Sequence, residues 1–153
     1  LMGEARHSVT AVSDMVLCTF PRGRVWELFS TQPSRAYDLT WIAAVEEHFL
    51  GETVATLGQR DARERVAWAL VRIWRRLVAL GMEDGGSVPF PFRQQDLADA
   101  LGLSIVHTNR RIVALRQAGL VEITGRRLVM HDHLRLSRIA QLDMDKDDVR
   151  PIL

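Results

Sequence analysis

The sequence contains almost no cysteine and almost no net charge. Its 153 residues include one cysteine, Cys18, which excludes an internal disulfide framework and favours a reducing, cytoplasmic compartment. The formal net charge is +1, so total charge does not indicate a nucleic-acid partner and the local distribution of charge must be considered instead. No apolar run approaches the roughly 20 residues of a membrane-spanning helix, and no signal peptide is recognisable, so no membrane partner is expected.

Motifs of enzyme and metal chemistry are missing as well. There is no glycine-rich phosphate loop, nucleophile motif or catalytic dyad, so the chain is not expected to be an enzyme. His131 and His133 alternate in an extended segment, but they have no third ligand near them in the sequence and are interpreted as a strand-end pair that caps the last helix. His48 and Glu52 share a helix face, where a solvated or interfacial pair is the simpler interpretation. No metal is predicted, and the residues identify no cofactor.

The N-terminal residues predict short strands followed by a short helix. Residues 8–20 form two β-prone runs separated by a Ser-Asp turn signal, and Pro21 ends the second run. Residues 25–29 favour a short helix, which Pro33 closes. Because the chain begins with Leu1 and a strand-like run follows almost at once, we interpret it as a fragment of a longer protein.

A long helix is predicted over residues 34–57. Its apolar residues recur at spacings of three and four, and Gly58 stands where the helix should end. Trp41 and Leu50 widen the apolar stripe, as a helix that packs against two neighbours or against a partner subunit requires. The central residues of this stripe are Leu39, Ile42, Val45 and Phe49.

The following helix has the clearest pattern in the chain. It opens with Asp61 and Glu64, which have the spacing of a capping box, and it ends at Gly81. Residues 81–92 are rich in turn formers and are interpreted as a domain connection, in which 88–92 is a candidate edge strand. The inward positions of the helix are Ala62, Val66, Leu70, Ile73, Leu77 and Leu80.

The middle of the chain has the pattern of a helix-turn-helix. A short helix is predicted over residues 94–101, in which the small Ala98 allows a second helix to pack closely. Gly102 supplies the positive φ that the turn needs without a Cβ clash. The second helix is predicted over 104–117, with Ser104 as its N-cap.

A hairpin and a final helix follow, which makes the unit winged. Residues 121–130 contain two β-prone runs joined around Gly125. The final helix starts near Asp132, and residues 143–153 form an acidic tail. The predicted inner face of the final helix consists of Leu134, Ile139 and Leu142.

The second helix of the pair has two faces that can be separated by angle, at 100° per residue. Asn109 and Arg110 lie on the outward face, and these are the side-chain types that pair bidentately with adenine and guanine edges in the major groove. Val106, on the same face, can contact a thymine methyl. The residues of the inward face, which should pack on the domain, are Ile105, Thr108, Ile112 and Leu115.

Positive charge is concentrated in this part of the chain. Between Ser104 and Arg127 there are five arginines and one acidic residue, Glu122, so this segment has a net charge of +4 in a chain whose total is +1. Positive charge concentrated in this way is what phosphate binding needs. Arg126 and Arg127, at the hairpin tip, are placed to reach the DNA backbone or an adjacent minor groove. The segment therefore predicts sequence-specific binding of double-stranded DNA. A winged-helix protein-interaction module without DNA binding is the alternative.

These residues resemble the Crp/Fnr family of bacterial transcription regulators. The stretch RQQDLADALGLSIVHTNRRIVALRQAGLVEITGRRLVMHD is similar to the family's C-terminal winged helix, and residues 61–80 resemble the helix before it. Residues 34–57 correspond to the family's long dimerisation helix, and residues 3–29 resemble the end of its cyclic-nucleotide-binding β-roll. The implied fold is mainly α with a small β part: a β-roll remnant at 1–33, a dimerisation helix at 34–58, a winged helix-turn-helix at 59–142 and an acidic tail at 143–153.

The resemblance also implies roles for particular residues. The chain would form a homodimer, and the dimer would bind a near-palindromic operator. The dimer contact would be made by Leu39, Ile42, Val45 and Phe49. Arg110 would be the family's base-reading arginine, with Val106 and Asn109 at the other base-reading positions. Contacts to the DNA backbone are expected from Arg93, Gln94, Gln95, Ser104, His107, Arg111, Arg116, Arg126 and Arg127.

The sequence departs from the family pattern at several positions. The best-known members carry a glutamate that reads a cytosine where this chain has Val106, so their half-site is not assumed here. Arg93 stands where a capping threonine is common. The nucleotide-binding members hold the cyclic phosphate with an Arg-Ser pair, which Arg6 and Ser8 match only loosely. The resemblance therefore identifies no effector. The loop 81–92 lies where the family contacts RNA polymerase, which makes this enzyme a candidate partner.

Overall fold

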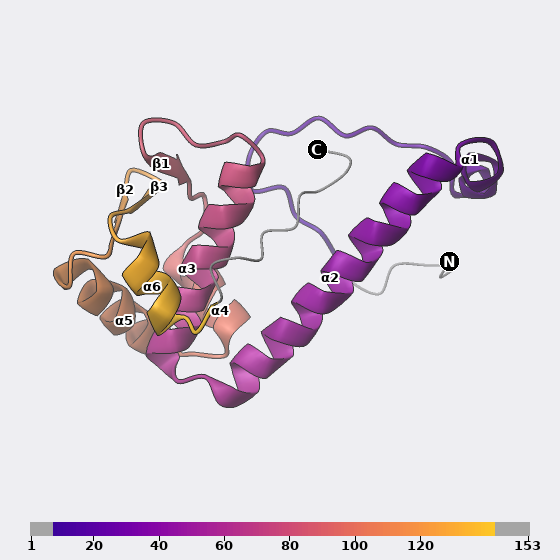
Figure 1. Ribbon diagram of the computed structural model, residues 1–153. Coiled ribbons are helices and arrows are strands. Elements are labelled where there is room, and N and C mark those ends of the chain that lie inside the picture. The colour runs from indigo at the N-terminus through magenta and orange to yellow at the C-terminus, as the bar shows by residue number, and fades with distance from the viewer. Residues whose placement is uncertain (1–7, 143–153) are drawn as a thin grey trace.

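The computed structural model describes residues 8–142, which form a set of helices with one small sheet at one side of them (Figure 1). The predicted acidic tail and the Arg6 position lie outside the described residues. Within residues 8–142, no helix combines the length and the apolarity that crossing a bilayer needs. The elements are a 3-10 turn (Arg22–Arg24), the helices α1 (Val25–Thr31), α2 (Pro33–Gln59), α3 (Ala62–Ala79), α4 (Gln94–Leu101), α5 (Ile105–Gln117) and α6 (His133–Ile139), and the strands β1 (Ser87–Pro89), β2 (Val121–Thr124) and β3 (Arg127–Met130).

The predicted strands at residues 8–20 are absent, so this prediction is wrong. The segment contains neither helix nor strand, and its apolar side chains Val9, Val16 and Leu17 are exposed. A β-prone run needs a neighbouring strand to satisfy its backbone groups, and an isolated pair of strands is at best marginally stable. The described part of the chain places no other strand beside this segment. The short helix predicted after it is confirmed as α1.

The long helix α2 confirms the prediction for residues 34–57 with small changes at its ends. It begins with Pro33 at its first turn, where the fixed φ of proline suits a helix and the missing N–H removes no hydrogen bond. Gly58 does not end the helix, which continues to Gln59. The chain becomes extended at Arg60, and α3 then returns beside α2 so that the two helices form a V (Figure 1).

The start of α3 is fixed by the predicted capping box. The carboxylate of Asp61 accepts the backbone N–H groups of Arg63 and Glu64 at 2.6 and 2.9 Å. The carboxylate of Glu64 accepts the backbone N–H of Asp61 at 2.8 Å. The N–H of Glu64 is the main cause that lowers the pKa of Asp61, and the N–H of Arg63 and the charges of Arg111 and Arg63 contribute. A cap of this kind typically stabilises a helix by about 1 kcal/mol.

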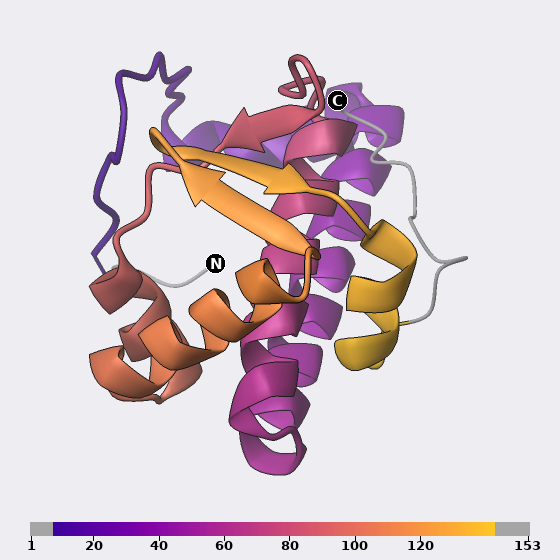
Figure 2. The ribbon, with the colours of Figure 1, turned by 90° about the vertical axis from the view of Figure 1, so that its left-hand side faces the viewer.

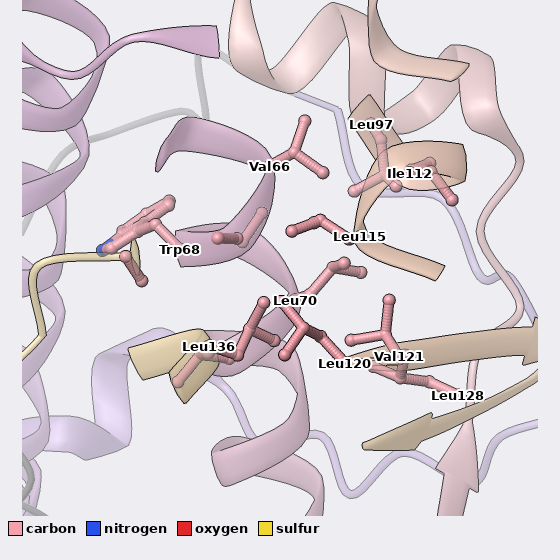
Figure 3. Packing of buried hydrophobic residues seen from close by; sticks show 14 of the residues in the cluster. Val66, Trp68, Leu70, Leu97, Ile112, Leu115, Leu120, Val121, Leu128 and Leu136 are labelled. Carbon is pink, nitrogen blue, oxygen red and sulfur yellow. The ribbon is translucent and has the colours of Figure 1, made fainter. Parts of the chain in front are cut away.

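The core forms around α3. Figure 2 shows the sheet, α5 and α6 arranged in front of this helix, and Figure 3 shows the side chains that meet there. From Val66 to Val71 every residue of α3 is buried, because α3 is covered on several sides. Burying one leucine side chain contributes about 1.5–3 kcal/mol. The buried leucines and valines of the same cluster on other segments are Val88, Leu97, Leu101, Leu115, Leu120, Val121, Leu128 and Leu136.

The sheet is a predicted hairpin with a third strand at its edge. The strand order is β1-β3-β2, and all neighbours are antiparallel. Thr124 pairs with Arg127, so the hairpin loop has two residues, Gly125 and Arg126. Both have positive φ, at 59° and 62°, which is the geometry that matches the twist of a hairpin. The edge strand predicted within 88–92 is confirmed one residue earlier, as β1.

The final helix is confirmed as α6, but its predicted inner face is partly wrong. Leu134 is 56% exposed, whereas Leu136 is fully buried. Residues three and four apart share a helix face, so Leu136, Ile139 and Ala140 face the core together. Leu134 lies five residues before Ile139 and therefore points well away from that side.

We predict opposite sensitivities for these two leucines. Leu136→Ala should lower the free energy of unfolding by about 2–5 kcal/mol, because it leaves a cavity in the core. Leu134→Ala, on the same helix, should change it by about 0.5 kcal/mol or less. Urea unfolding followed by circular dichroism measures both. Equal losses for the two variants would contradict the described packing of α6.

Candidate nucleic-acid interface

Two short helices and a tight turn hold the candidate interface in place. Gly102 follows α4 in the left-handed region with φ 61°, and the N–H of Leu103 bonds back to the carbonyl of Ala98 at 2.9 Å. Ala98 is fully buried, which lets α5 lie close to α4. The hydroxyl of Ser104 accepts the N–H of His107 at 3.2 Å and caps α5. The predicted helix-turn-helix is therefore confirmed at both its turn and its cap.

The inward face of α5 differs from the prediction at one residue. Thr108, Ile112 and Leu115 are buried as expected, but Ile105 is 44% exposed. Ile105 has nearly the same angular position as Ile112, so its exposure comes from its place at the first residue of the helix. No neighbouring element among the described residues covers that end. Its prediction as a packing residue is wrong.

The outward face of α5 carries all three predicted base-reading residues. Val106 is 58% exposed, and Asn109 and Arg110 are exposed beside it. Among residues 8–142, neither Arg110 nor Arg116 has a hydrogen bond or ion pair to another side chain or to the backbone. A guanidinium without an intramolecular partner keeps its donors available for a ligand.

A small cleft separates α5 from the hairpin. Phe90 and Phe92 line it edge to face, with ring centroids 5.5 Å apart, and Ile123 of β2 forms another wall. Asn109 and Arg116 line its polar side. The hairpin therefore stands next to the outward face of α5, as a wing does.

The two arginines of the wing have different surroundings. The guanidinium of Arg127 donates to the hydroxyl of Ser87 at 2.7 Å and to the backbone carbonyls of Ser87 and Asp84 at 3.0 and 3.1 Å. Its charge also lies 3.8 Å from the carboxylate of Asp84. Arg126 is exposed at the tip, and its side chain makes one hydrogen bond, to the carbonyl of Pro91 at 3.3 Å. Arg127 thus holds the turn before β1, while Arg126 projects from the wing.

The other residues predicted to contact the DNA backbone lie on or next to α4 and α5, and several of them are bonded to nearby side chains. The backbone N–H of Arg93 donates to Asp96 at 2.6 Å, and its guanidinium lies 3.2 Å from the same carboxylate, whose pKa it lowers. The amide of Gln95 donates to Asp99 at 2.6 Å, and Gln94 is exposed at the first position of α4. On α5, the side chains of His107 and Arg111 are hydrogen-bonded at 3.0 Å.

The long helix α2 has two different faces. Phe49 stacks on Trp68 of α3, with ring centroids 5.8 Å apart and 14° between the ring planes. Leu50 and Val54 point elsewhere and are 62% and 71% exposed. The residues predicted for a dimer contact are thus divided, because Phe49 packs within the chain. The remaining three, which are half-buried, are Leu39, Ile42 and Val45.

The histidine and glutamate pairs considered in the sequence have structural partners. His131 lies 3.6 Å from Glu122 across the hairpin. The cap of α6 is Asp132, whose carboxylate accepts the N–H of Arg135 at 2.9 Å, so the prediction that the histidine pair caps this helix is wrong. Glu52 accepts the indole N–H of Trp68 at 2.8 Å and forms an ion pair with Arg72. No group of three or more potential metal ligands occurs within residues 8–142. Sequence reasoning missed the roles of Glu52 and Arg127, since their partners lie 16 or more residues away.

The fold and this surface define a winged helix-turn-helix protein. Residues 64–139 match the Crp-like helix-turn-helix domain. The chain thus carries a Crp-like helix-turn-helix domain and is homologous to the FnrL and FixK regulators of the Crp/Fnr family.

Named relatives match over most of this chain but over little more than half of their own length. The transcriptional activator protein FnrL of Cereibacter sphaeroides is 32% identical over 91% of this chain and 58% of its own. The nitrogen fixation regulation protein FixK of Bradyrhizobium diazoefficiens is 29% identical over 92% and 59%. The solved structure of FixK2 from Bradyrhizobium japonicum has a TM-score of 0.67 and 25% identity, covering 77% of this chain and 58% of that one.

We predict that the two wing arginines affect stability in opposite directions. Arg127→Ala should lower the free energy of unfolding by about 1–3 kcal/mol, because it leaves the Ser87 and Asp84 acceptors without their donor. Arg126→Gly should raise it by about 0.5–1 kcal/mol, since glycine adopts a positive φ without strain. Chemical unfolding measures both, and a stabilising Arg127→Ala would contradict the assigned role of that side chain.

Proposed function

We propose that this chain binds double-stranded DNA in a sequence-specific manner and regulates transcription. The observation that carries the proposal is the outward face of α5, where Val106, Asn109 and Arg110 lie together and exposed beside a wing. A helix of this size fits the major groove, in which each base pair presents its own pattern of donors and acceptors. FnrL, whose name describes a transcriptional activator, belongs to the same class.

Each of the three residues suits one kind of base contact. The guanidinium of Arg110, which has no partner among residues 8–142, can donate two hydrogen bonds to a guanine edge. The amide of Asn109 can donate to and accept from an adenine edge. Val106 offers a methyl surface to thymine and cannot accept a hydrogen bond from cytosine. We therefore propose a half-site with a thymine opposite Val106 and a guanine opposite Arg110.

The phosphate contacts are proposed around this face. Arg116 is unpaired within the described residues, and Arg126 projects from the wing tip. Arg127, in contrast, acts through its hold on the turn before β1 and positions the wing. The other proposed phosphate contacts come from residues at the helix starts and from polar side chains, which are Arg93, Gln94, Gln95, Ser104, His107 and Arg111.

The backbone at Arg126 supports a functional role for its side chain. Its φ of 62° lies in the left-handed region, where a residue with a Cβ costs about 1 kcal/mol more than glycine. Local strain at an exposed position is often associated with function. The guanidinium of Arg126 is exposed, so it adds no packing to the core and does not stabilise the fold in that way. Binding of a phosphate accounts for an arginine at this position.

Arg110→Ala should lower the affinity for the preferred site by about 1–3 kcal/mol and relax the preference at one base pair, because a bidentate base contact is lost. Arg126→Gly should weaken binding evenly across sequences and make its salt dependence shallower, since a phosphate contact is lost. Both are measured by fluorescence anisotropy, with a duplex selected from a random pool by the wild-type chain and with a scrambled duplex.

Two outcomes would contradict these roles. Equal losses on the selected and scrambled duplexes for Arg110→Ala would exclude a base-reading role for this residue. If the wild-type chain binds neither duplex at low salt, the DNA-binding proposal fails. The exposed apolar pair Ile105 and Val106 would then favour the alternative, a winged-helix module that binds another protein.

We further propose that the chain acts as a homodimer through the exposed face of α2. At 100° per residue, Leu39, Leu50 and Val54 fall within about 60° of one another, whereas Phe49 points toward Trp68 of its own chain. An apolar stripe exposed along a helix suits a second copy of the same helix. Two recognition helices related by a dimer axis would enter successive major grooves about 34 Å apart.

Leu50→Ala combined with Val54→Ala should raise the dissociation constant of the dimer at least about tenfold, because two side chains that are exposed in the single chain and buried in the proposed dimer lose their apolar contacts. Sedimentation equilibrium of the whole chain measures this constant. Phe49→Ala is the matched control: it should lower the free energy of unfolding but leave the dissociation constant unchanged. A monomeric wild-type chain at high concentration would contradict the proposed dimer.

The remaining assignments are proposals drawn from the family. The loop 81–92, which Arg127 holds at its Asp84 and Ser87 end, is the candidate contact for RNA polymerase. We place the protein in the cytoplasm, where its DNA would be. The signal that it senses is not assigned to any residue of this chain.

A further inference from the structure

The contact between α2 and α3 is made by a few polar and aromatic side chains. Trp68 of α3 is buried and lies at the centre of this contact. Its ring stacks on Phe49, and its indole N–H donates to Glu52 at 2.8 Å. Glu52 also forms an ion pair with Arg72, one turn further along α3. A single carboxylate of α2 thus holds two successive turns of α3.

A second group of contacts fixes the point where the two helices meet. The guanidinium of Arg60 bonds to the hydroxyl of Thr56 and, at 3.2 Å, to the carbonyl of Gln141. The amide of Gln141 donates to Glu64 at 2.8 Å. The side chain of Arg65 donates to the carbonyl of Arg60 at 2.8 Å. The junction of α2 and α3 is therefore tied to the end of α6.

The angle between α2 and α3 depends on a pivot and on the contacts away from it, which are the buried group around Glu52 and the exposed Glu46–Arg76 ion pair at 3.0 Å. The pivot is the junction at Arg60, and the contact at Glu52 lies eight residues before it, about 12 Å along α2. The 18 residues of α3 span about 27 Å, so a rotation of about 10° at the pivot moves the far end of α3 by about 5 Å. The wing lies toward that far end (Figure 1).

We propose that Glu52 is a positioning residue for DNA binding: its bonds to Trp68 and Arg72 set the α2–α3 angle, and with it the separation of the two recognition helices in the dimer. The inference rests on the proposed function, because that separation matters only to a dimer on two half-sites. Without the carboxylate, the Trp68 N–H and the Arg72 charge lose their shared partner, and the helices can open. The Phe49–Trp68 stack and the exposed Glu46–Arg76 ion pair, at 3.0 Å, then remain between the two helices.

The first experiment measures the angle without DNA. Spin labels are attached at Ala44→Cys on α2 and at Ala79→Cys at the far end of α3, both exposed, in a chain whose exposed cysteine is removed by Cys18→Ser. Excess unlabelled chain confines the measured distance to one protomer. The distance distribution should be narrow with Glu52 and should broaden or shift by about 5 Å with Glu52→Ala. His48→Gln, exposed one turn earlier on α2, is the control and should leave the distribution unchanged.

The second experiment measures the consequence for DNA. The whole chain is titrated with a duplex that carries two half-sites and with a duplex that carries one. Glu52→Ala should lower the two-site affinity at least tenfold and leave the one-site affinity within twofold, and it should broaden the preferred half-site spacing. Glu52→Gln, which can still accept the Trp68 N–H but not pair with Arg72, should give a smaller loss. Dimer dissociation should stay unchanged.

The outcomes separate this inference from the proposed function. An unchanged label distance in Glu52→Ala overturns the positioning role, as does an equal loss on one-site and two-site duplexes. If the wild-type chain binds no duplex but the label distance still depends on Glu52, the angle is set as proposed and the DNA-binding function is what fails. A Glu52→Gln variant with the wild-type spacing preference and wild-type distance would show that the ion pair has no part in it.

Discussion

The burial of α3 is the constraint on which the rest of the structure depends. This helix has a run of wholly buried residues, from Val66 to Val71, so it must be covered by other elements on several sides. The covering elements are α5, α6 and the sheet, which supply leucines such as Leu115 and Leu136. Because α5 uses its inward face for this packing, its opposite face with Arg110 is left toward solvent.

The arginines of the recognition segment divide into two groups once their partners are known. Arg110 and Arg116 have no partner among residues 8–142, whereas Arg127 is bonded to the turn at Asp84 and Ser87. Arg126 belongs to neither group: its side chain makes one hydrogen bond, and its backbone is strained. The charge available to a ligand is therefore smaller than the sequence suggests, and it is concentrated beside the residues proposed to read bases.

Much of the fold could be predicted because its signals are local. The capping box at Asp61, the left-handed Gly102 and the cap at Ser104 each act within a few residues, and each is confirmed. The failures arise where an outcome depends on distant neighbours. Residues 8–20 have strand propensity but no strand beside them, and Leu134 has the right chemistry on the wrong side of its helix.

The amino-acid sequence by itself determined the order of the helices, the helix-turn-helix and its wing, and the residues of the outward face of α5, because helical periodicity and caps are properties of short segments. Only the tertiary structure decided which polar side chains remain available. Arg127 meets Ser87 from 40 residues away, and Glu52 meets Trp68 across two helices. Such pairs form only after the core has brought their elements together, so no local sequence pattern predicts them.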